Sequence, residues 1–305
     1  LSMMLISFAA EDPGDWGHLV RRAEEADRAG IDRLALSDHV VFGENLEAYA
    51  DPSLGGTSGG RQPTGPDGHW LEPLTLATFL ASRTTHSRFM TNILIAALRR
   101  PAVLAKSAST LDVLSGGRLD LGVGVGWQRE EYEAAGLDFD SRGAQLDHTL
   151  DVVQRLWRES RADFADERLE FSGIHQMPKP RQDGGVPIWV SGTVNRRSMT
   201  RLARFGSGWI PWGDDAADLV SSIPRMREAV AAAGGDAEGI EVTGTLPVRA
   251  NDDGSTDLSA TMDPVPELAA AGVTDFRLGV RLAPDAPDAE ERLTELVHAF
   301  RSAAT

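Results

Sequence analysis

Short apolar runs alternate with amphipathic stretches along the whole chain, eight times in all. The runs have the length of buried strands, and each is followed by a pattern with the helical period. Together they predict strands at residues 3–8, 33–38, 89–95, 119–125, 187–191, 208–211, 240–248 and 275–280. Such alternation is typical of an α/β fold, the closed (β/α)8 TIM-type barrel, with a doubly wound open sheet as the alternative.

Several predicted helices have recognisable ends. The first covers about residues 15–29 and is followed by Gly30, a residue suited to a helix C-terminal cap. The third begins at Pro101, a favoured first helical position, and stops at the Ser-Gly-Gly sequence of 115–117. The fourth starts near Gly143. No linker or repeat divides the chain, so we expect one domain, residues 1–305.

Three connections are long enough to be insertions in a barrel. They follow the second strand (40–71), the seventh strand (249–263) and the fourth helix, before strand five (160–186). Loops that follow barrel strands lie at the C-terminal face, where active sites of this fold are found. We therefore expect 40–71 to form a lid or substrate wall, and 249–263 to be mainly a surface excursion.

The fourth predicted strand carries three glycines, Gly122, Gly124 and Gly126. Their G-x-G-x-G spacing differs from the dinucleotide fingerprint G-x-G-x-x-G, and no clear helix follows before Gly143. Strand alternation places the glycines and Asp120 on one face and the bulky residues on the other. If the bulky face packs against the outer helices, the glycine face points inward. It then leaves room for a flat ring, or it fits a narrow barrel interior.

The second predicted strand gives an independent indication of which residues line the barrel mouth. Leu34 and Leu36 share one face, and alternation puts His39 on the opposite face. If the leucines pack outward, His39 reaches the barrel mouth with Asp38 beside it. A histidine there is suited to exchange a proton, although a structural role is the alternative.

Composition narrows the set of partners. The net charge is −16, from 46 acidic and 30 basic residues, which argues against nucleic acid or an acidic membrane surface as a partner. Cysteine is absent, which excludes disulfides and thiolate chemistry and is compatible with a cytoplasmic location. The histidines show no metal spacing, so we expect no metal, and no apolar run approaches a membrane span of about 20 residues. The first residues read as a strand and not as a signal peptide.

Four segments together resemble the luciferase-like monooxygenase superfamily, most closely its members that use the deazaflavin coenzyme F420. They are LALSDHVVFG (34–43), the run 99–136 that contains GGRLDLGVGVGWQREE, SRGAQLDHTLDVVQRLW (141–157) and the run 178–211 that contains PIWVSGTVNRR. The resemblance implies a TIM-type barrel that binds coenzyme F420, or alternatively FMN, at its C-terminal mouth.

The resemblance also implies site residues. Asp38 and His39 would line the ring and substrate pocket and act as the catalytic residues. A backbone bulge behind the ring, often with a cis peptide that does not involve proline, would fall in strand three, and the phosphate would bind before the helix that starts near Asn195. The cofactor-binding candidates are Asp38, Thr91, Asn92, Ile93, Gly124, Gly126, Trp127, Gly192, Thr193 and Arg196.

Arginines gather behind the expected phosphate loop. Arg196, Arg197, Arg201 and Arg204 follow it closely. The guanidinium fork matches both phosphate and carboxylate, so this cluster suits a cofactor with a phosphate and a glutamate tail. The alternative is a solvated helix face paired with the abundant acidic residues.

Three functions remain open on this sequence. The first is hydride transfer between coenzyme F420 and a small, weakly polar organic substrate. The others are oxygen-dependent monooxygenation with reduced FMN, and a flavin-binding barrel without turnover. We expect a homodimer, since dimers are common in the superfamily.

Two departures bear on the substrate. In the sugar-phosphate dehydrogenase branch an acidic glutamate stands where this chain has Trp127, and a tryptophan stands where it has Gly43. We therefore expect a substrate less polar than glucose 6-phosphate. Glu130 and Glu131 would supply a carboxylate only if their loop folds back.

Overall fold

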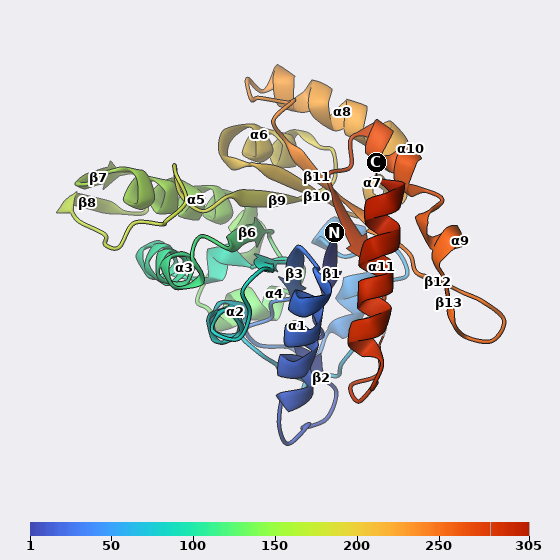
Figure 1. The fold of residues 1–305 in the computed structure, drawn as a ribbon. Coiled ribbons are helices and arrows are strands. Elements are labelled where there is room, and N and C mark those ends of the chain that lie inside the picture. Colours follow the sequence, from blue (N-terminus) through green and yellow to red (C-terminus); the bar gives the residue numbers. More distant parts are fainter. Residues whose placement is uncertain (281, 305) are drawn as a thin grey trace.

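The computed structural model describes residues 1–280 and 282–304, and eight parallel strands close into a barrel at its centre (Figure 1). This arrangement confirms the predicted (β/α)8 TIM-type fold, and the open-sheet alternative is wrong. In spatial order the strands are β1 (Ser2–Met4), β14 (Asp275–Leu278), β11 (Glu241–Leu246), β10 (Gly208–Pro211), β9 (Ile188–Gly192), β6 (Leu119–Val123), β5 (Arg88–Thr91) and β3 (Arg33–Leu36).

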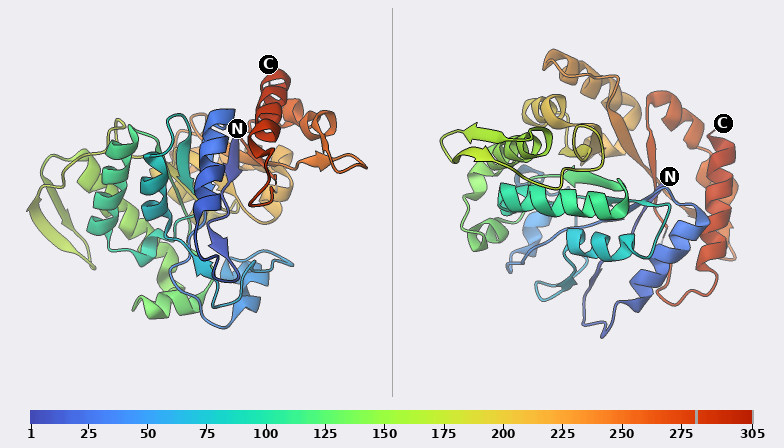
Figure 2. Two further views of the ribbon diagram at one scale, coloured as in Figure 1. Left: turned by 60° about the horizontal axis from the view of Figure 1, so that its bottom comes forward. Right: turned by 60° about the vertical axis from the view of Figure 1, so that its left-hand side comes forward.

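Helices cover the outside of the barrel (Figure 2). Gly30 caps the first helix in the left-handed conformation with φ 88°, and the third begins at Pro101, as predicted. Among the described residues, none of the helices has the length and apolar character needed to span a membrane. The outer helices are α1 (Gly17–Ala29), α2 (Pro73–Ala81), α3 (Pro101–Ser115), α5 (Arg142–Arg158), α6 (Arg196–Phe205), α8 (Leu219–Ala232), α10 (Val265–Ala271) and α11 (Ala289–Ala303).

Side chains along the strands point alternately toward the outer helices and into the barrel, as predicted. Leu34 and Leu36 of β3 are buried in the apolar layer between barrel and helices, together with Leu121 and Val123 of β6. Asp120, on the glycine face of β6, instead forms ion pairs with Arg33 of β3 and Arg88 of β5. The glycine face therefore points into the barrel.

The barrel interior is filled below the mouth. Met90, Trp189 and Ile210 form a small apolar cluster that is separate from the main core. At the N-terminal end of the strands, Arg33 lies 2.9 Å from Asp120 and 2.9 Å from Asp275. Buried charges are tolerated when they are paired in this way. These side chains fill the barrel interior, so a ligand would enter from the C-terminal mouth.

The three long connections carry small elements of their own. The segment 40–71 contains η1 (Leu46–Ala50), η2 (Pro52–Leu54) and β4 (His69–Trp70), which pairs with β2 (Phe8–Ala9). The segment 160–186 forms the projecting hairpin of β7 (Ala162–Ala165) and β8 (Glu170–Ile174), at the left of Figure 1. The segment 249–263 contains β12 (Arg249–Ala250), β13 (Thr256–Asp257) and α9 (Leu258–Met262), on the opposite side.

The segment 40–71 reaches over the barrel mouth. The Trp212 indole N–H, from the loop after β10, donates to the carbonyl of Gly56 at 2.9 Å. A Cβ added at Gly55 would lie 2.9 Å from the carbonyl oxygen of Gly126, after β6. These contacts place the segment across the ends of β6 and β10, which is consistent with the predicted lid or wall.

One helix differs from the sequence prediction. A clear helix was expected only near Gly143, but the short α4 (Arg129–Ala134) comes earlier, directly after the glycine strand. It is six residues long, too short for an apolar period to reveal it. Its position matters because it faces the end of β3.

Candidate active site

The predicted site residues follow four neighbouring strands of the barrel. β3 leads to Asp38 and His39, β5 to Asn92 and Ile93, β6 to Gly124 through Trp127, and β9 ends at Gly192. These strands are adjacent in the order β9, β6, β5, β3. The C-terminal ends therefore bring all the candidates to one arc of the mouth.

His39 contacts a buried carboxylate at this arc. Its Nδ1 is 3.1 Å from Oε2 of Glu131, on α4, and Oε1 of Glu131 accepts the Val40 N–H at 2.8 Å. The Glu131 side chain has no exposed surface, while that of His39 is 9% exposed. A carboxylate at Nδ1 favours the tautomer with the proton on Nδ1. Nε2 is then left to exchange a proton with a ligand.

Aromatic rings surround the His39 imidazole. Phe42 lies 4.2 Å away between ring centroids, Trp70 of β4 is edge-on at 4.8 Å, and Trp127 is edge-on at 5.9 Å. Tyr49 of the lid lies 5.3 Å from Trp127. The imidazole of His39 is thus held in a largely apolar wall, part of it contributed by the segment 40–71.

Asp38 makes a different set of contacts from His39. Both its oxygens are bound by Arg99, at 2.6 and 2.8 Å, and one also accepts the Ile95 N–H at 2.9 Å. Arg99 also contacts Glu72 at 3.0 Å. Burial lowers the pKa of the Arg99 guanidinium, but the two carboxylates outweigh this and raise it overall. Asp38 therefore fixes the loop after β5, and its catalytic role stays a prediction.

The loop after β5 has the backbone feature that the resemblance implied. The peptide bond between Asn92 and Ile93 is cis. The Thr91 hydroxyl donates to the Gly122 carbonyl at 2.7 Å. A Cβ at Gly124 would lie 2.8 Å from Cδ1 of Ile93. The room left by this glycine thus admits the Ile93 side chain, which favours the narrow-interior interpretation at Gly124.

Two buried polar atoms near the mouth fit a ring cofactor. Among the described residues, Asn92 Oδ1 and Ser7 Oγ are buried without a hydrogen-bond partner. They follow β5 and β1, which flank β3. Buried polar groups are normally hydrogen-bonded, and an unpaired one calls for a ligand or water. A deazaflavin or flavin ring offers N–H and carbonyl groups that would satisfy them.

The predicted phosphate loop is only partly free to bind an anion. The Asn195 side chain caps α6 by accepting the Ser198 N–H at 3.0 Å. The N–H of Val194 already donates to the carboxylate of Asp215 at 2.6 Å. Gly192 allows close packing here, because a Cβ would lie 2.6 Å from the Ser198 hydroxyl. Phosphate binding at Gly192, Thr193 and Arg196 stays a prediction, with one backbone donor fewer than expected.

Sequence reasoning missed three of these contacts. The sequence indicates Glu131 only as a carboxylate that a folded-back loop could supply, because the short α4 that positions it has no periodic pattern. Asp215 and the pairing of Arg99 with Asp38 join residues distant in the chain. Of the described residues, no group of three or more His, Asp or Glu is arranged to hold a metal ion.

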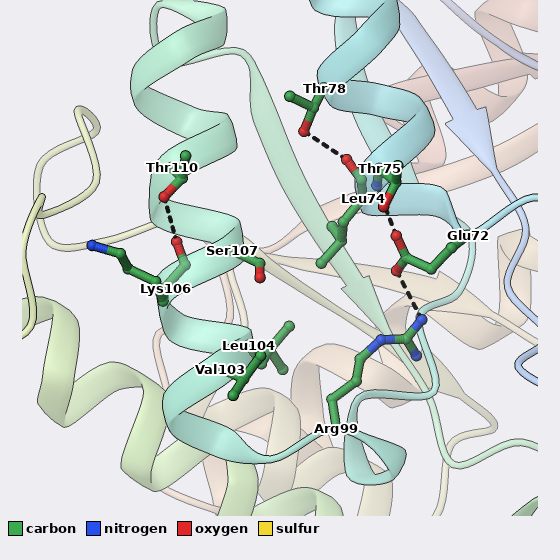
Figure 3. A pocket seen from close by; sticks show the side chains of 10 residues that line it. All are labelled: Glu72, Leu74, Thr75, Thr78, Arg99, Val103, Leu104, Lys106, Ser107 and Thr110. Atoms are coloured by element: carbon green, nitrogen blue, oxygen red, sulfur yellow. Dashed lines mark hydrogen bonds and ion pairs between the residues drawn. The ribbon is translucent and has the colours of Figure 1, made fainter.

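A separate groove lies outside the barrel, between α2 and α3 (Figure 3). Its volume is about 500 Å³, and Glu72 and Arg99 stand at one end, with Thr75, Val103 and Ser107 along its length. It contains none of the predicted site residues. The mouth of the barrel, and not this groove, is the candidate active site.

The sequence is similar to that of a known family and of several known proteins. The family model for luciferase-like monooxygenases matches residues 3–292. An uncharacterized protein of Mycobacterium tuberculosis (strain ATCC 25618 / H37Rv) is 28% identical over 305 residues, with 94% of each chain covered. The F420-dependent glucose-6-phosphate dehydrogenase of that strain is 28% identical over 261 residues, covering 82% of this chain and 66% of the relative.

Solved structures share the fold. An F420-dependent secondary alcohol dehydrogenase in complex with an F420–acetone adduct has a TM-score of 0.74 at 17% identity, with 98% of both chains covered. A long-chain alkane monooxygenase has a TM-score of 0.75 at 15% identity, with 99% of this chain and 90% of the other covered. At such identities the likeness establishes the barrel fold.

Proposed function

The chain belongs to the luciferase-like monooxygenase family, and on that premise we propose that it transfers a hydride between coenzyme F420 and a small, weakly polar organic substrate. The pairing of His39 with Glu131 at the barrel mouth carries this proposal. Interconversion of an alcohol and a carbonyl moves a proton together with the hydride, so it needs an acid–base group at the site. The relatives and solved structures that use F420 support the choice of cofactor.

The residues at the mouth have separate roles in the proposed reaction. The deazaflavin, when bound, supplies the ring carbon that exchanges the hydride. Asn92 and Ser7 would hold the ring through their unpaired oxygens. Nε2 of His39 takes the hydroxyl proton in alcohol oxidation and returns it in carbonyl reduction, and Glu131 stabilises the imidazolium that forms.

The surface of the mouth supports a weakly polar substrate. Ile6 and Val40 are 56% and 52% exposed, after the neighbouring strands β1 and β3. Val41 is 41% exposed, and Phe42 and Trp70 lie beside the His39 ring. Exposed apolar side chains gathered at one opening are typical of a binding surface.

An anaerobic assay tests the proposal. The protein is mixed with oxidised F420 and a panel of secondary alcohols, and loss of the oxidised cofactor is followed. We expect His39→Ala to lower turnover at least about tenfold while leaving folding and cofactor binding intact. If the variant loses stability and cofactor together, His39 is structural and the proposed role fails.

An FMN-dependent monooxygenase is the second candidate. The apolar mouth would equally accept a hydrocarbon chain, and the alkane monooxygenase has the same fold. Substrate-dependent oxygen consumption with reduced FMN would favour this function. Binding of a flavin without turnover in either assay would favour the non-catalytic barrel.

A further inference from the structure

Arg277 is a buried cation that the proposed function leaves unused. It lies on β14, where its neighbours Phe276 and Leu278 pack outward in the main core, so alternation points Arg277 into the barrel. The mouth opens above it, because Thr245 and Gly279 are both exposed. Thr245 is the register partner of Arg277 on β11, and Gly279 is the next inward position along the chain after β14.

The guanidinium of Arg277 has few partners for a side chain that is only 10% exposed. One terminal nitrogen lies 3.5 Å from the sulfur of Met90, a weak acceptor, and 3.8 Å from the carboxylate of Asp275. Among the described residues, its Nε is buried without a hydrogen-bond partner. Burial lowers the pKa of Arg277, and the carboxylate of Asp275 offsets this only in part. Burying a charge with so few partners costs free energy, which a function of the charge would explain.

The other charges inside the barrel balance one another. Two arginines face two aspartates there, in the ion pairs Arg33–Asp120 (2.9 Å), Arg33–Asp275 (2.9 Å) and Arg88–Asp120 (2.7 Å). Glu241 stands at the N-terminal end of β11 and is exposed, so solvent screens its charge. Among the described residues of the interior, Arg277 therefore adds one positive charge that is not compensated.

This charge lies beneath the place proposed for the cofactor ring. Met90, which contacts Arg277, is two residues before Asn92 and on the same face of the strand. Successive residues on one face are about 7 Å apart, so the guanidinium lies roughly one layer below Asn92. Among the described residues, Asn92 Oδ1 is an acceptor without a partner, and the one N–H of an oxidised deazaflavin ring belongs to its pyrimidine end. The pyrimidine end would therefore lie above Arg277.

We propose that the positive charge of Arg277 stabilises the reduced form of the bound deazaflavin. The inference rests on the proposed function and extends it to a residue beneath the ring. In alcohol oxidation the C–H bond of the alcohol breaks, a C–H bond forms at the ring carbon, and His39 takes the hydroxyl proton. The hydride moves an electron pair onto the nitrogen and carbonyl of the pyrimidine end, whereas the oxidised ring spreads its charge along its length. A buried cation acts on such a charge without direct contact, because the interior screens it weakly.

Binding measurements test this role without relying on turnover. Oxidised and reduced F420 are titrated separately against the protein by calorimetry under nitrogen, with no substrate present. The ratio of the two Kd values gives the shift in reduction potential that the protein imposes on the cofactor. We expect the reduced form to bind at least about fivefold more tightly than the oxidised form.

Two variants assign the preference to the charge. Arg277→Met should lower the ratio at least about fivefold, mainly by weakening the binding of the reduced form, and Arg277→Lys should keep most of the preference. Asp275 stays paired with Arg33 in both variants, so Arg277→Met should fold and unfold no more easily than the unmodified protein. Arg21→Gln is the matched control, because Arg21 is exposed on α1, and it should leave the ratio unchanged.

The outcomes separate this inference from the proposed function. An unchanged ratio in Arg277→Met, or an equal loss of both affinities together with stability, would make Arg277 structural and leave the proposed function standing. Equal or tighter binding of the oxidised form by the unmodified protein would also overturn the inference, whatever the variants do. If neither form of F420 binds and FMN does, the proposed function fails and the role of Arg277 fails with it.

Discussion

Glu131 determines how the imidazole of His39 is held, because its two oxygens bind Nδ1 of His39 and the Val40 N–H. A fully buried carboxylate bound in this way has little freedom to turn. In the proposed reaction it would orient the ring and stabilise the charged form during proton transfer, while Nε2 acts on the substrate. The proposed function therefore makes Glu131 a positioning residue.

Replacement of this carboxylate should impair proton transfer more than binding. In Glu131→Gln the amide can still accept the Val40 N–H, but its NH2 group would donate to Nδ1 of His39 and place the imidazole proton on Nε2. We expect kcat to fall at least about tenfold, with cofactor affinity nearly unchanged. Steady-state kinetics and cofactor titration measure the two effects.

Glu133→Gln provides the matched control, since Glu133 is exposed on the same short helix. It should leave kcat unchanged. The positioning role would be contradicted if Glu131→Gln kept full kcat, or if both variants lost it equally.

Single residues of the site were predictable to different degrees. The inward position of His39 follows from strand alternation alone, and so does that of Asp120. The partner of His39 depends on where α4 lies against β3, which no local pattern encodes. The pairing of Asp38 with Arg99 likewise joins two separate loops, and it gives Asp38 a holding role that alternation does not reveal.

At the scale of elements, the carboxylate of Asp27 joins the end of α1 to the loop before β5. It accepts the backbone N–H groups of Thr85, His86 and Ser87 at 2.9, 2.8 and 2.6 Å. Burial raises the pKa of Asp27, but these hydrogen bonds outweigh it and lower the pKa overall. These hydrogen bonds fix the position of the loop before β5 relative to α1.

Loss of this charge should destabilise the fold in a pH-dependent way. Asp27→Asn should lower the free energy of unfolding by about 1–3 kcal/mol at pH 7, because an amide cannot accept all these donors. Since the folded-state pKa lies below the unfolded value of about 3.9, the advantage of Asp27 is complete above that pH. It should disappear as pH falls through the lower, folded-state pKa.

Urea unfolding of both proteins at neutral and acidic pH measures this gap. Glu228→Gln, at an exposed position on α8, should change stability little at either pH. A stability difference that persists unchanged at low pH would show that the ionised carboxylate is not responsible.

Long elements with strong patterns were predictable, and short ones were not. All eight barrel strands coincide with the predicted apolar runs, and α1 and α3 have the predicted caps. The glycine strand β6 shows the limit of this reasoning. The sequence predicts which face of β6 points inward, but the contact between Ile93 and Gly124 depends on the backbone of the neighbouring strand β5.

At the scale of the whole molecule, one arc of the barrel combines the contact between His39 and Glu131 with an apolar rim. The barrel fold was predictable from the alternation of apolar strand runs with amphipathic helical stretches, because each strand–helix unit repeats the same local pattern. The packing of the segment 40–71 over the mouth depends on long-range contacts such as that of Trp212 with Gly56. The homodimer stays a prediction, which light scattering would test.

The character of the mouth predicts which substrates are excluded. Trp127 is 5% exposed and lies beside Tyr49, at the position where the resemblance implies an acidic side chain in the sugar-phosphate dehydrogenase branch. Glu131 is engaged by His39 and Val40 and has no exposed surface. We expect glucose 6-phosphate to give negligible F420 reduction, with secondary alcohols turned over at least about tenfold faster. Efficient oxidation of glucose 6-phosphate would show that Trp127 does not mark a change of substrate.

The choice of cofactor decides the reaction class, so side-by-side binding of oxidised F420 and FMN to the purified protein tests the central claim most directly. Each is titrated by fluorescence under the same buffer and salt conditions. The proposed function predicts a lower Kd for F420 than for FMN. Equal or tighter binding of FMN would contradict it and would favour the oxygen-dependent monooxygenase.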